Sequence, residues 1–476
     1  MAYKKSFYCD ITAFHPGVTG SCFSNEIRYP NGERQNFLLD LGLFQETQYL
    51  SLNQKLDFNP ALFDYVFATH AHTDHIGRIP MAFKNGFKGT VFGTVITQRI
   101  LELFLEDTLM INKLKHAAPI FSEKNIRQTM AHTKAVDYNQ PIRLDNYLTA
   151  CFYGNAHIPG AASIGFDIHY PGHEEISLFY SSDLKLHSDY LKVPPIPQKV
   201  YHKKAIIMME ATYGTTYTKN IPDTFERDLV EVLEENKTVF LSSFAQARPL
   251  DLMYTIRKLQ DSGKIAPNIM VYIDGTLLLS CLNVYLNSYE FFSKSFDEIL
   301  PYNLMKVNPK RREAIIRSHH AKIIIGTSGT CDNGPAQVYI PLLIDREDAA
   351  IFINSGYLPP ESIGHTLLET PIGESLSFNG TRLIKRAHVF QNKASSSHAK
   401  LNDIIEFLSR FQRPQAIIFN HGDPQSKEYA AKTIRANTNI HAKYVGIANR
   451  NSVIRICPWG YVKEFEKPKS LAFQTA

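Results

Sequence analysis

The sequence has few cysteines and no long apolar run. None of the six cysteines belongs to a CxxC pair, which excludes a zinc ribbon and gives no sign of a disulfide framework. No apolar segment approaches the length of a membrane span, and the stretch MAYKKSFYCDITAFHPG lacks the apolar core of a signal peptide. We therefore expect a protein of the reducing cytoplasm with no membrane partner.

Charge of neither sign dominates the chain. Lys and Arg number 51 and Asp and Glu number 46, which gives a formal net charge of +5. This mildly basic balance permits a nucleic-acid partner without requiring one. The length of 476 residues exceeds what one ordinary hydrophobic core organises, so we expect two domains or one domain with a large insertion.

Short apolar runs alternate with helical patterns along the chain. Buried parallel strands are typically apolar over four residues or more, and such runs occur in NFLLDLG, DYVFATH, SLFYSSD, AIIMMEATYG, TVFLSSFA, NIMVYIDG, AKIIIGTSG, AAIFINSGY and AIIFNHGD. Two segments between them place apolar side chains on one helical face: Phe225, Leu229, Val232 and Leu233 in the first, and Leu401, Ile404, Ile405 and Leu408 in the second. This alternation predicts an α/β fold.

Many of these runs end in a side chain that can take part in chemistry. The endings are Asp40, His70, Asp183, Glu210, Ser328 and His421. Sites in α/β sheets gather beyond the carboxyl ends of the strands. We therefore expect the functional site at such an edge.

The run DYVFATH leads into HAHTDH, a stretch that places four potential metal ligands in six positions. These are His70, His72, Asp74 and His75. Imidazole and carboxylate groups suit Zn²⁺. Four ligands this close cannot all serve one tetrahedral ion that keeps an open position, so the stretch predicts two metals that share a bridging water.

HxHxDH after a strand resembles the second motif of the metallo-β-lactamase fold, an αββα sandwich whose hydrolases use one or two metals. LLDLGLFQ resembles the first motif with Asp40, NAHIPGAAS the third with His157, and FYSSDL the fourth with Asp183. The resemblance implies that Asp40 braces a ligating histidine and that Asp183 bridges both metals. Asn155 and Ser182 stand where the family usually has glycine, which changes backbone freedom rather than the ligands.

The chain continues well beyond Asp183, and three later stretches resemble motifs A, B and C of the β-CASP group, nucleases of the metallo-β-lactamase superfamily. MMEATYG supplies Glu210, SSSHAK supplies His398 and FNHGDP supplies His421. Lys400 stands where motif B usually has an acidic residue. A loop with a chance histidine is the alternative for this stretch.

The resemblance implies a metallo-β-lactamase sandwich with an inserted β-CASP α/β domain. Residues 1–210 would form the first part of the sandwich, 211–373 the insert, and 374–476 the completing part with motifs B and C. VTGSC and THAHTDHIGRIP are most similar to the branch that contains the nuclease subunit of the cleavage and polyadenylation specificity factor and its prokaryotic relatives. That branch implies RNA as the substrate and permits a homodimer.

The resemblance also assigns roles. One zinc ion would take His70, His72 and His157, the other Asp74, His75 and His421, with Asp183 bridging; manganese is the alternative metal. A hydroxide activated by the two ions would attack the RNA phosphodiester, with Asp74 among the catalytic residues. His398 would protonate the leaving oxygen, and Glu210 would orient it and raise its pKa.

Two features of the insert are candidate RNA contacts. GTSGTCDNG follows a strong strand, so Ser328, Thr330 and the backbone N–H groups around them are candidate phosphate ligands. An ordinary strand–helix turn is the alternative. Arg248 is a candidate contact to backbone phosphates, with a surface salt bridge as its alternative.

The leading interpretation is a zinc-dependent ribonuclease with its active site between two domains, acting as an endonuclease, a 5′ exonuclease or both. A DNA nuclease of the same group is an alternative, but its members typically lack a histidine at the position of His421. A non-catalytic scaffold is another alternative; degenerate subunits lose ligands, whereas every ligand position is filled here. A small-molecule hydrolase such as a thioesterase does not need so large an insert.

Overall fold

The computed structural model describes residues 6–15, 17–114, 118–218, 224–318, 320–356, 358–392, 397–460 and 462–466. The chain divides into two compact units. The first unit comprises residues 1–218 and 397–476, and the second unit comprises residues 219–396. No helix of the described segments is both long and apolar enough to cross a membrane.

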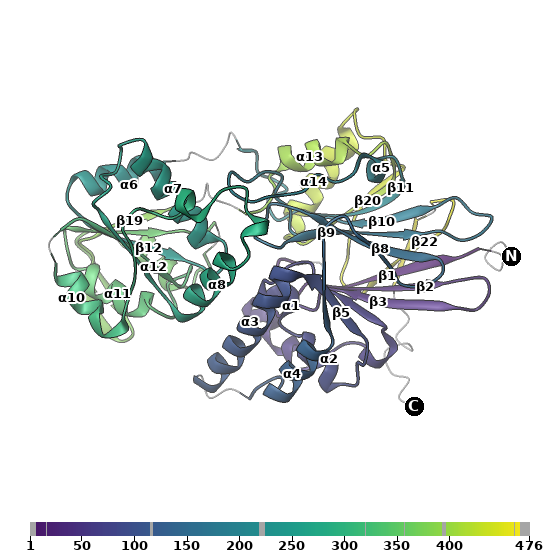
Figure 1. The fold of residues 1–476 in the computed structure, drawn as a ribbon, viewed down its shortest axis with the longest axis horizontal. Coiled ribbons are helices and arrows are strands. Elements are labelled where there is room, and N and C mark those ends of the chain that lie inside the picture. The colour runs from purple at the N-terminus through teal and green to yellow at the C-terminus, as the bar shows by residue number, and fades with distance from the viewer. Residues whose placement is uncertain are drawn as a thin grey trace. The chain divides into compact units, whose positions relative to one another are not determined.

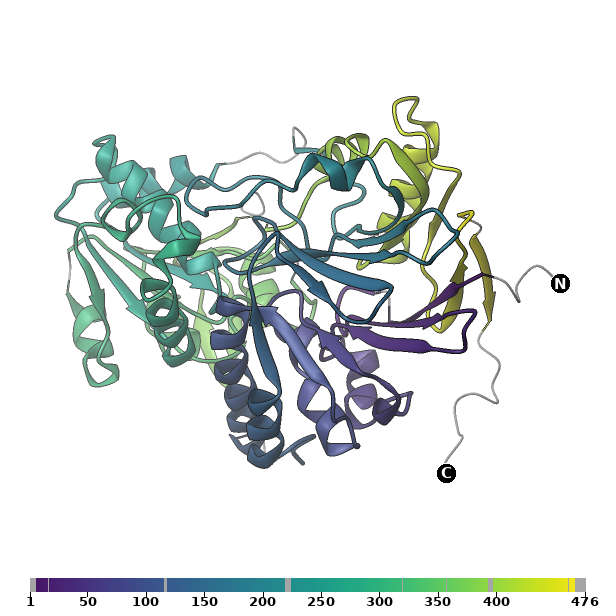
Figure 2. The same cartoon turned by 45° about the vertical axis from the view of Figure 1, so that its right-hand side comes forward.

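Two large sheets form the centre of the first unit (Figure 1). The eight-stranded sheet has the order β23 (Val462–Glu466), β22 (Ser452–Ile456), β1 (Tyr8–His15), β2 (Cys22–Arg28), β3 (Arg34–Leu39), β4 (Tyr65–Phe67), β5 (Thr90–Thr94) and β6 (Thr133–Val136). The seven-stranded sheet has the order β21 (Tyr444–Ile447), β20 (Arg413–Asn420), β11 (Lys204–Glu210), β10 (Ile176–Tyr180), β9 (Ala162–Ile168), β8 (Leu148–Gly154) and β7 (Pro141–Arg143). Figure 2 shows late and early parts of the chain side by side, where β22 pairs antiparallel with β1.

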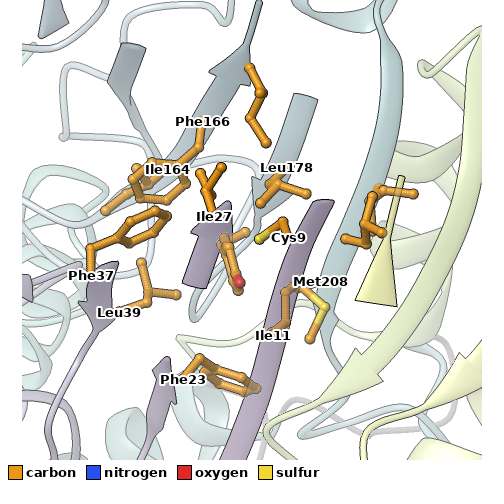
Figure 3. Close-up of a cluster of buried hydrophobic side chains, with 14 of the residues drawn as sticks. Cys9, Ile11, Phe23, Ile27, Phe37, Leu39, Ile164, Phe166, Leu178 and Met208 are labelled. Atoms are coloured by element: carbon orange, nitrogen blue, oxygen red, sulfur yellow. The ribbon is translucent and has the colours of Figure 1, made fainter. Parts of the chain in front are cut away.

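The main hydrophobic core of the first unit lies between these two sheets (Figure 3). Phe37 of one sheet stacks on Phe166 of the other, with ring centroids 4.3 Å apart. Alternation along each strand sends one set of apolar side chains into this layer. A second core, which includes Phe179 and Phe407, joins the other face of the seven-stranded sheet to its helices.

Helices cover the outer faces of both sheets (Figure 1). One face carries α1 (Thr73–Ile76), α2 (Ile79–Lys84), α3 (Val95–Leu114) and α4 (Glu123–Ala131). The other carries α5 (Gln198–Tyr201), α13 (Leu401–Ser409) and α14 (Pro424–Ala436). The first unit is therefore an αββα sandwich, as expected.

A parallel sheet forms the centre of the second unit. Its order is β14 (Leu304–Lys306), β13 (Met270–Asp274), β15 (Lys322–Thr327), β12 (Thr238–Ser243), β16 (Ala349–Ile353) and β19 (His388–Gln391), and β17 (Ser375–Phe378) with β18 (Thr381–Ile384) forms a separate hairpin. The helices are α6 (Phe225–Glu234), α7 (Arg248–Asp261), α8 (Thr276–Leu286), α9 (Phe296–Ile299), α10 (Arg312–Arg317), α11 (Ala336–Leu343) and α12 (Ile363–Glu369). This arrangement is the inserted α/β domain.

The insert ends later than residue 373, where we expected it to end. The second unit extends to residue 396, because β19 adds to its central sheet by pairing with β16. The unit also begins at residue 219 rather than 211. The sequence gives no signal that β19 pairs with β16 of the insert and does not belong to the domain that follows it.

The apolar runs and helical faces are where we expected them. Each of the nine runs overlaps a strand. The four apolar residues predicted for α6 are all buried. In α13 the buried residues are Leu401, Ile404, Phe407 and Leu408, so Phe407 takes the place we gave to Ile405 and packs against Phe411 and Tyr201.

Candidate metal centre

Strand ends of the first unit place the predicted ligands at one edge of the sandwich. Asp40 follows β3, His70 lies three residues after β4, and His72 precedes α1. Asp183 lies three residues after β10 and His421 directly follows β20. Because β10, β11 and β20 are parallel, as are β3 and β4, their carboxyl ends share an edge.

The first ligand group is His70, His72, His157 and Asp183. Nδ1 of His72 lies 3.0 Å from Nε2 of His70 and 3.1 Å from Nε2 of His157. Oδ2 of Asp183 is 3.5 Å from Nε2 of both His70 and His157. Neighbouring ligand atoms of a tetrahedral zinc stand about 3.3 Å apart when the bonds are about 2.0–2.1 Å, so this group fits one such ion.

The second group is Asp74, His75 and His421. The other oxygen of Asp183, Oδ1, lies 3.3 Å from Nε2 of His75 and 3.1 Å from Nε2 of His421. Asp183 therefore faces both groups, one oxygen to each. This is the position from which a carboxylate can bridge two metal ions.

Buried atoms in the cluster lack the hydrogen bonds that burial normally requires. Nε2 of His75 and Oδ1 of Asp183 have no hydrogen-bond partner among the described residues. An unpaired buried polar atom is costly, and a bound cation would satisfy both. The residues present therefore fit a metal centre.

The electrostatics of the cluster favour a cation. Burial lowers the pKa of His70 and His157 well below the usual range, and lowers the pKa of His421 to about 3, so these imidazoles offer a free lone pair. At His75, burial is outweighed by Asp183, Asp40 and Asp74, and the pKa is raised. The carboxylates of the site thus favour a positive charge between them.

Neighbouring groups hold two of the histidines, His75 and His157, by their second ring nitrogen. Nδ1 of His75 is 2.8 Å from Oδ2 of Asp40. Nδ1 of His157 donates to the carbonyl of Ser397 at 2.7 Å; the serines before Ser397 in motif B lie outside the described residues. These contacts turn each Nε2 toward the cluster, as the hydrogen-bond partners of metal-ligating histidines do.

Thr69 is a buried residue with several hydrogen bonds at the site, and the sequence did not indicate its role. Its N–H and hydroxyl both donate to Asp40, at 2.9 and 3.1 Å. Its hydroxyl also lies 3.0 Å from Nδ1 of His70 and accepts from Ser182 at 2.7 Å. The one available signal was its position directly before the HxHxDH stretch.

The predicted acid pair lies beside the metal-ligand cluster. Nδ1 of His398 is 3.0 Å from Oε2 of Glu210, and Nε2 of His398 is 3.9 Å from Oδ2 of Asp183. Glu210 is fully buried, and its other oxygen accepts the N–H of Leu184. Burial lowers the pKa of His398, but Glu210 and Asp183 outweigh it and raise the pKa to about 9.

The three departures from the family pattern each have a structural account. Ser182 has φ 53°, a left-handed conformation that favours glycine. The Asn155 side chain donates to the Asp183 carbonyl and accepts the His157 N–H, both at 3.1 Å. Lys400 caps α13, and its N–H donates to Asp403 at 2.9 Å.

The candidate RNA contacts all belong to the second unit. Ser328 and Thr330 follow β15, and Arg248 begins α7. Arg248 makes no ion pair with any described residue, so the salt bridge we considered as its alternative is absent there. The structure brings these three residues to the carboxyl edge of β12 and β15 and leaves the acid pair and metal ligands in the first unit.

Comparison with known proteins adds family matches over most of the chain. The β-CASP domain model matches residues 249–367, and the model of a Zn-dependent metallo-hydrolase RNA specificity domain matches residues 383–445. The model of the anti-Pycsar protein Apyc1 matches residues 18–226. The fold and the ligand cluster define a metallo-β-lactamase sandwich with an inserted domain.

Curated relatives and a solved structure agree with these matches. Ribonuclease TTHA0252 of Thermus thermophilus is 26% identical over 426 residues, covering 86% of this chain and 91% of that protein. Transcription termination factor FttA of Methanocaldococcus jannaschii is 28% identical over 396 residues, covering 78% of this chain and 60% of that protein. A crystal structure of a protein of unknown function from Enterococcus faecalis shares the fold, with a TM-score of 0.57, 14% identity, and coverage of 95% of this chain and 100% of that one. The chain is thus similar to β-CASP proteins of the metallo-β-lactamase superfamily over most of its length.

Proposed function

We propose that this protein is a metal-dependent ribonuclease that hydrolyses phosphodiester bonds of single-stranded RNA. The observation that carries the proposal is the cluster of seven candidate ligand side chains, Asp183 among them, with the His398–Glu210 pair beside it. A phosphodiester needs charge neutralisation at phosphorus and a proton for its leaving oxygen. This cluster offers residues for both requirements.

Two zinc ions are the proposed cofactor, with manganese as the alternative. His70, His72 and His157 would hold one ion and Asp74, His75 and His421 the other, with Asp183 shared between them. Such ions supply Lewis acidity toward a phosphoryl oxygen and lower the pKa of a bound water toward neutrality. Asp40, Thr69 and the Ser397 carbonyl would keep the histidine rings aimed.

His398 is the proposed general acid. Its Nδ1 is held by Glu210, and its Nε2 lies at the cluster, 3.9 Å from Oδ2 of Asp183, where it can carry a proton toward the leaving oxygen. Glu210 cannot take up this role because it is fully buried and its oxygens already accept two hydrogen bonds. The pair thus separates one residue that delivers a proton from one that positions it.

The relatives support RNA as the polymer. One is named a ribonuclease, and the matching C-terminal family model is described as an RNA specificity domain. The chain spans only 60% of the length of the FttA relative, so we do not propose a role in transcription termination for it.

Six free cysteines in the described structure are compatible with the reducing compartment that we propose.

The test is direct competition between end-labelled RNA and DNA oligonucleotides of one sequence at one stated salt concentration. We expect cleavage of the RNA and little or no cleavage of the DNA, because a cleft that contacts the 2′-hydroxyl distinguishes the two polymers. Equal or faster DNA cleavage would favour the DNA nuclease alternative. The same gel separates the two modes of action, because an endonuclease produces internal fragments and an exonuclease releases mononucleotides.

A further inference from the structure

The strand order of the second unit reverses between β12 and β15. From β12 the chain crosses to β13 on one side, and from β15 it crosses to β16 on the other, although β12 and β15 are neighbours in the sheet. In open α/β sheets, ligands bind beyond the carboxyl ends of the strands at this kind of reversal. The residues that follow these two strands are Phe244 to Arg248 and Ser328 to Cys331.

Two polar atoms at this point lack partners. Nε of Arg248 and Oγ of Ser328 are buried and have no hydrogen-bond partner among the described residues. They come from the two neighbouring strand ends, since Ser243 is paired in register with Thr327. A guanidinium and a hydroxyl that follow neighbouring strand ends suit a phosphate oxygen.

Phe244 is an exposed aromatic ring at the same point. It directly follows β12, and 48% of its surface is exposed. Its ring lies against Gly329, where a methyl group on the glycine would stand only 2.7 Å from the ring. Gly329 therefore lets the ring lie close to the loop after β15, and the exposed remainder of the ring is open to a planar partner.

We propose that Phe244, Arg248 and Ser328 form a one-nucleotide subsite for single-stranded RNA. A base stacks on the ring of Phe244, and the adjoining phosphate is held by the Arg248 guanidinium and the Ser328 hydroxyl. The subsite rests on the proposed ribonuclease function and extends it, because it assigns a base contact to the second unit. Stacking on an aromatic ring tolerates any base, so the subsite adds affinity without sequence preference.

The test measures RNA affinity by stopped-flow fluorescence anisotropy of the metal-loaded protein, before cleavage accumulates. Phe244→Ala should weaken binding of a labelled single-stranded oligoribonucleotide by about 5- to 150-fold, as removal of a base-stacking aromatic does, whereas Phe244→Trp should restore it. Tyr289→Ala is the matched control, because Tyr289 is 77% exposed and lies after α8, away from the carboxyl ends of the strands. Arg248→Gln should reduce the slope of log affinity against log salt by about 0.7.

Single abasic substitutions along the oligonucleotide locate the stacked base. One abasic position should weaken binding to the wild-type protein and leave Phe244→Ala unaffected. Unchanged affinity in Phe244→Ala, or the same loss with every abasic oligonucleotide, would overturn the subsite. The binding measurement needs no turnover. Absence of RNA cleavage would therefore count against the proposed function, whereas the binding result would still test the subsite.

Discussion

Three of the five candidate histidine ligands are each held at the second ring nitrogen by another group of the chain. Asp40 holds His75, Thr69 contacts His70, and the Ser397 carbonyl holds His157 across 240 residues of sequence. Fixing one ring nitrogen decides which nitrogen faces the metal. The arrangement therefore presets ligand directions before any ion binds.

The acid pair gives the sharpest prediction at this scale. His398→Ala and Glu210→Gln should both retain bound metal yet cleave RNA about 10²- to 10⁴-fold more slowly, because proton delivery to the leaving oxygen is lost. Single-turnover cleavage of labelled RNA and elemental analysis of the same preparations provide the two readings.

A substrate with a p-nitrophenolate leaving group controls for general damage. This leaving group needs no proton, so His398→Ala should hydrolyse a p-nitrophenyl phosphodiester at close to the wild-type rate. If the variant is equally slow on both substrates, or fully active on RNA, His398 is not the general acid.

The clustering of the candidate ligands could be predicted because their residue types and spacing are unusual along the sequence. Thr69 was not, because its role depends on contacts with Asp40 and Ser182, which lie 29 and 113 residues away. A threonine beside a histidine has no local feature that indicates hydrogen bonds to such distant residues. Side chains that act through distant partners become visible only in the fold.

Several strands end in a left-handed turn at the site. Asp40, Ser182 and His421 have φ values of 58°, 53° and 43°, and lie after β3, β10 and β20. Non-glycine residues in this region are strained, and they gather at functional sites. The turns redirect the chain so that side chains at the strand ends meet over the sheet edge.

Asn155 joins the loop after β8 to the loop after β10, and this gives a prediction for these loops. Asn155→Gly, which restores the usual family residue, should destabilise the protein by about 1–3 kcal/mol, because the buried Asp183 carbonyl and His157 N–H lose their partner. Urea unfolding measures the change. Asn139→Gly is the control, since Asn139 has φ 61° in a loop outside the site; an equal loss in both variants would contradict the account.

Strands and helical faces followed from the apolar patterns, whereas the end of the insert did not. Helix α6 buries the four residues that its spacing indicated. The return strand β19 is short, and three of its four residues are only partly buried, so neither its length nor its pattern assigned it to a sheet. Its pairing with β16 is a long-range choice that local sequence does not encode.

At the scale of the whole molecule, each unit has its own hydrophobic core, and the second unit also buries a charged side chain. The second unit buries Lys322, whose Nζ donates to the Ser318 carbonyl and the Thr238 hydroxyl. Burial, with a smaller effect of Arg346, lowers the pKa of Lys322 from 10.5 to about 8. The folded protein therefore releases this proton more readily than the unfolded chain.

This shift predicts a pH dependence of stability. Between about pH 8 and 10.5 the unfolded chain holds a proton that the folded protein has lost, so the contribution of Lys322 to stability rises with pH. Lys322→Met should gain stability relative to wild type most clearly below pH 8 and lose that advantage toward pH 10.5, as measured by urea unfolding. The exposed Lys264→Met controls for the loss of one lysine from the second unit; a stability difference for Lys322→Met that does not change with pH would refute the assignment.

The central claim is that the His/Asp cluster of the first unit is a two-metal centre that cleaves RNA. The most direct measurement removes bound metal with a chelator, returns Zn²⁺ in known amounts, and follows the cleavage rate of end-labelled single-stranded RNA at each step. The account predicts no cleavage without metal, a rise with added Zn²⁺ that reaches its plateau at about two equivalents per chain, and no rise at any amount in His72→Ala. Full activity of the metal-free protein, or a plateau at one equivalent, would contradict it.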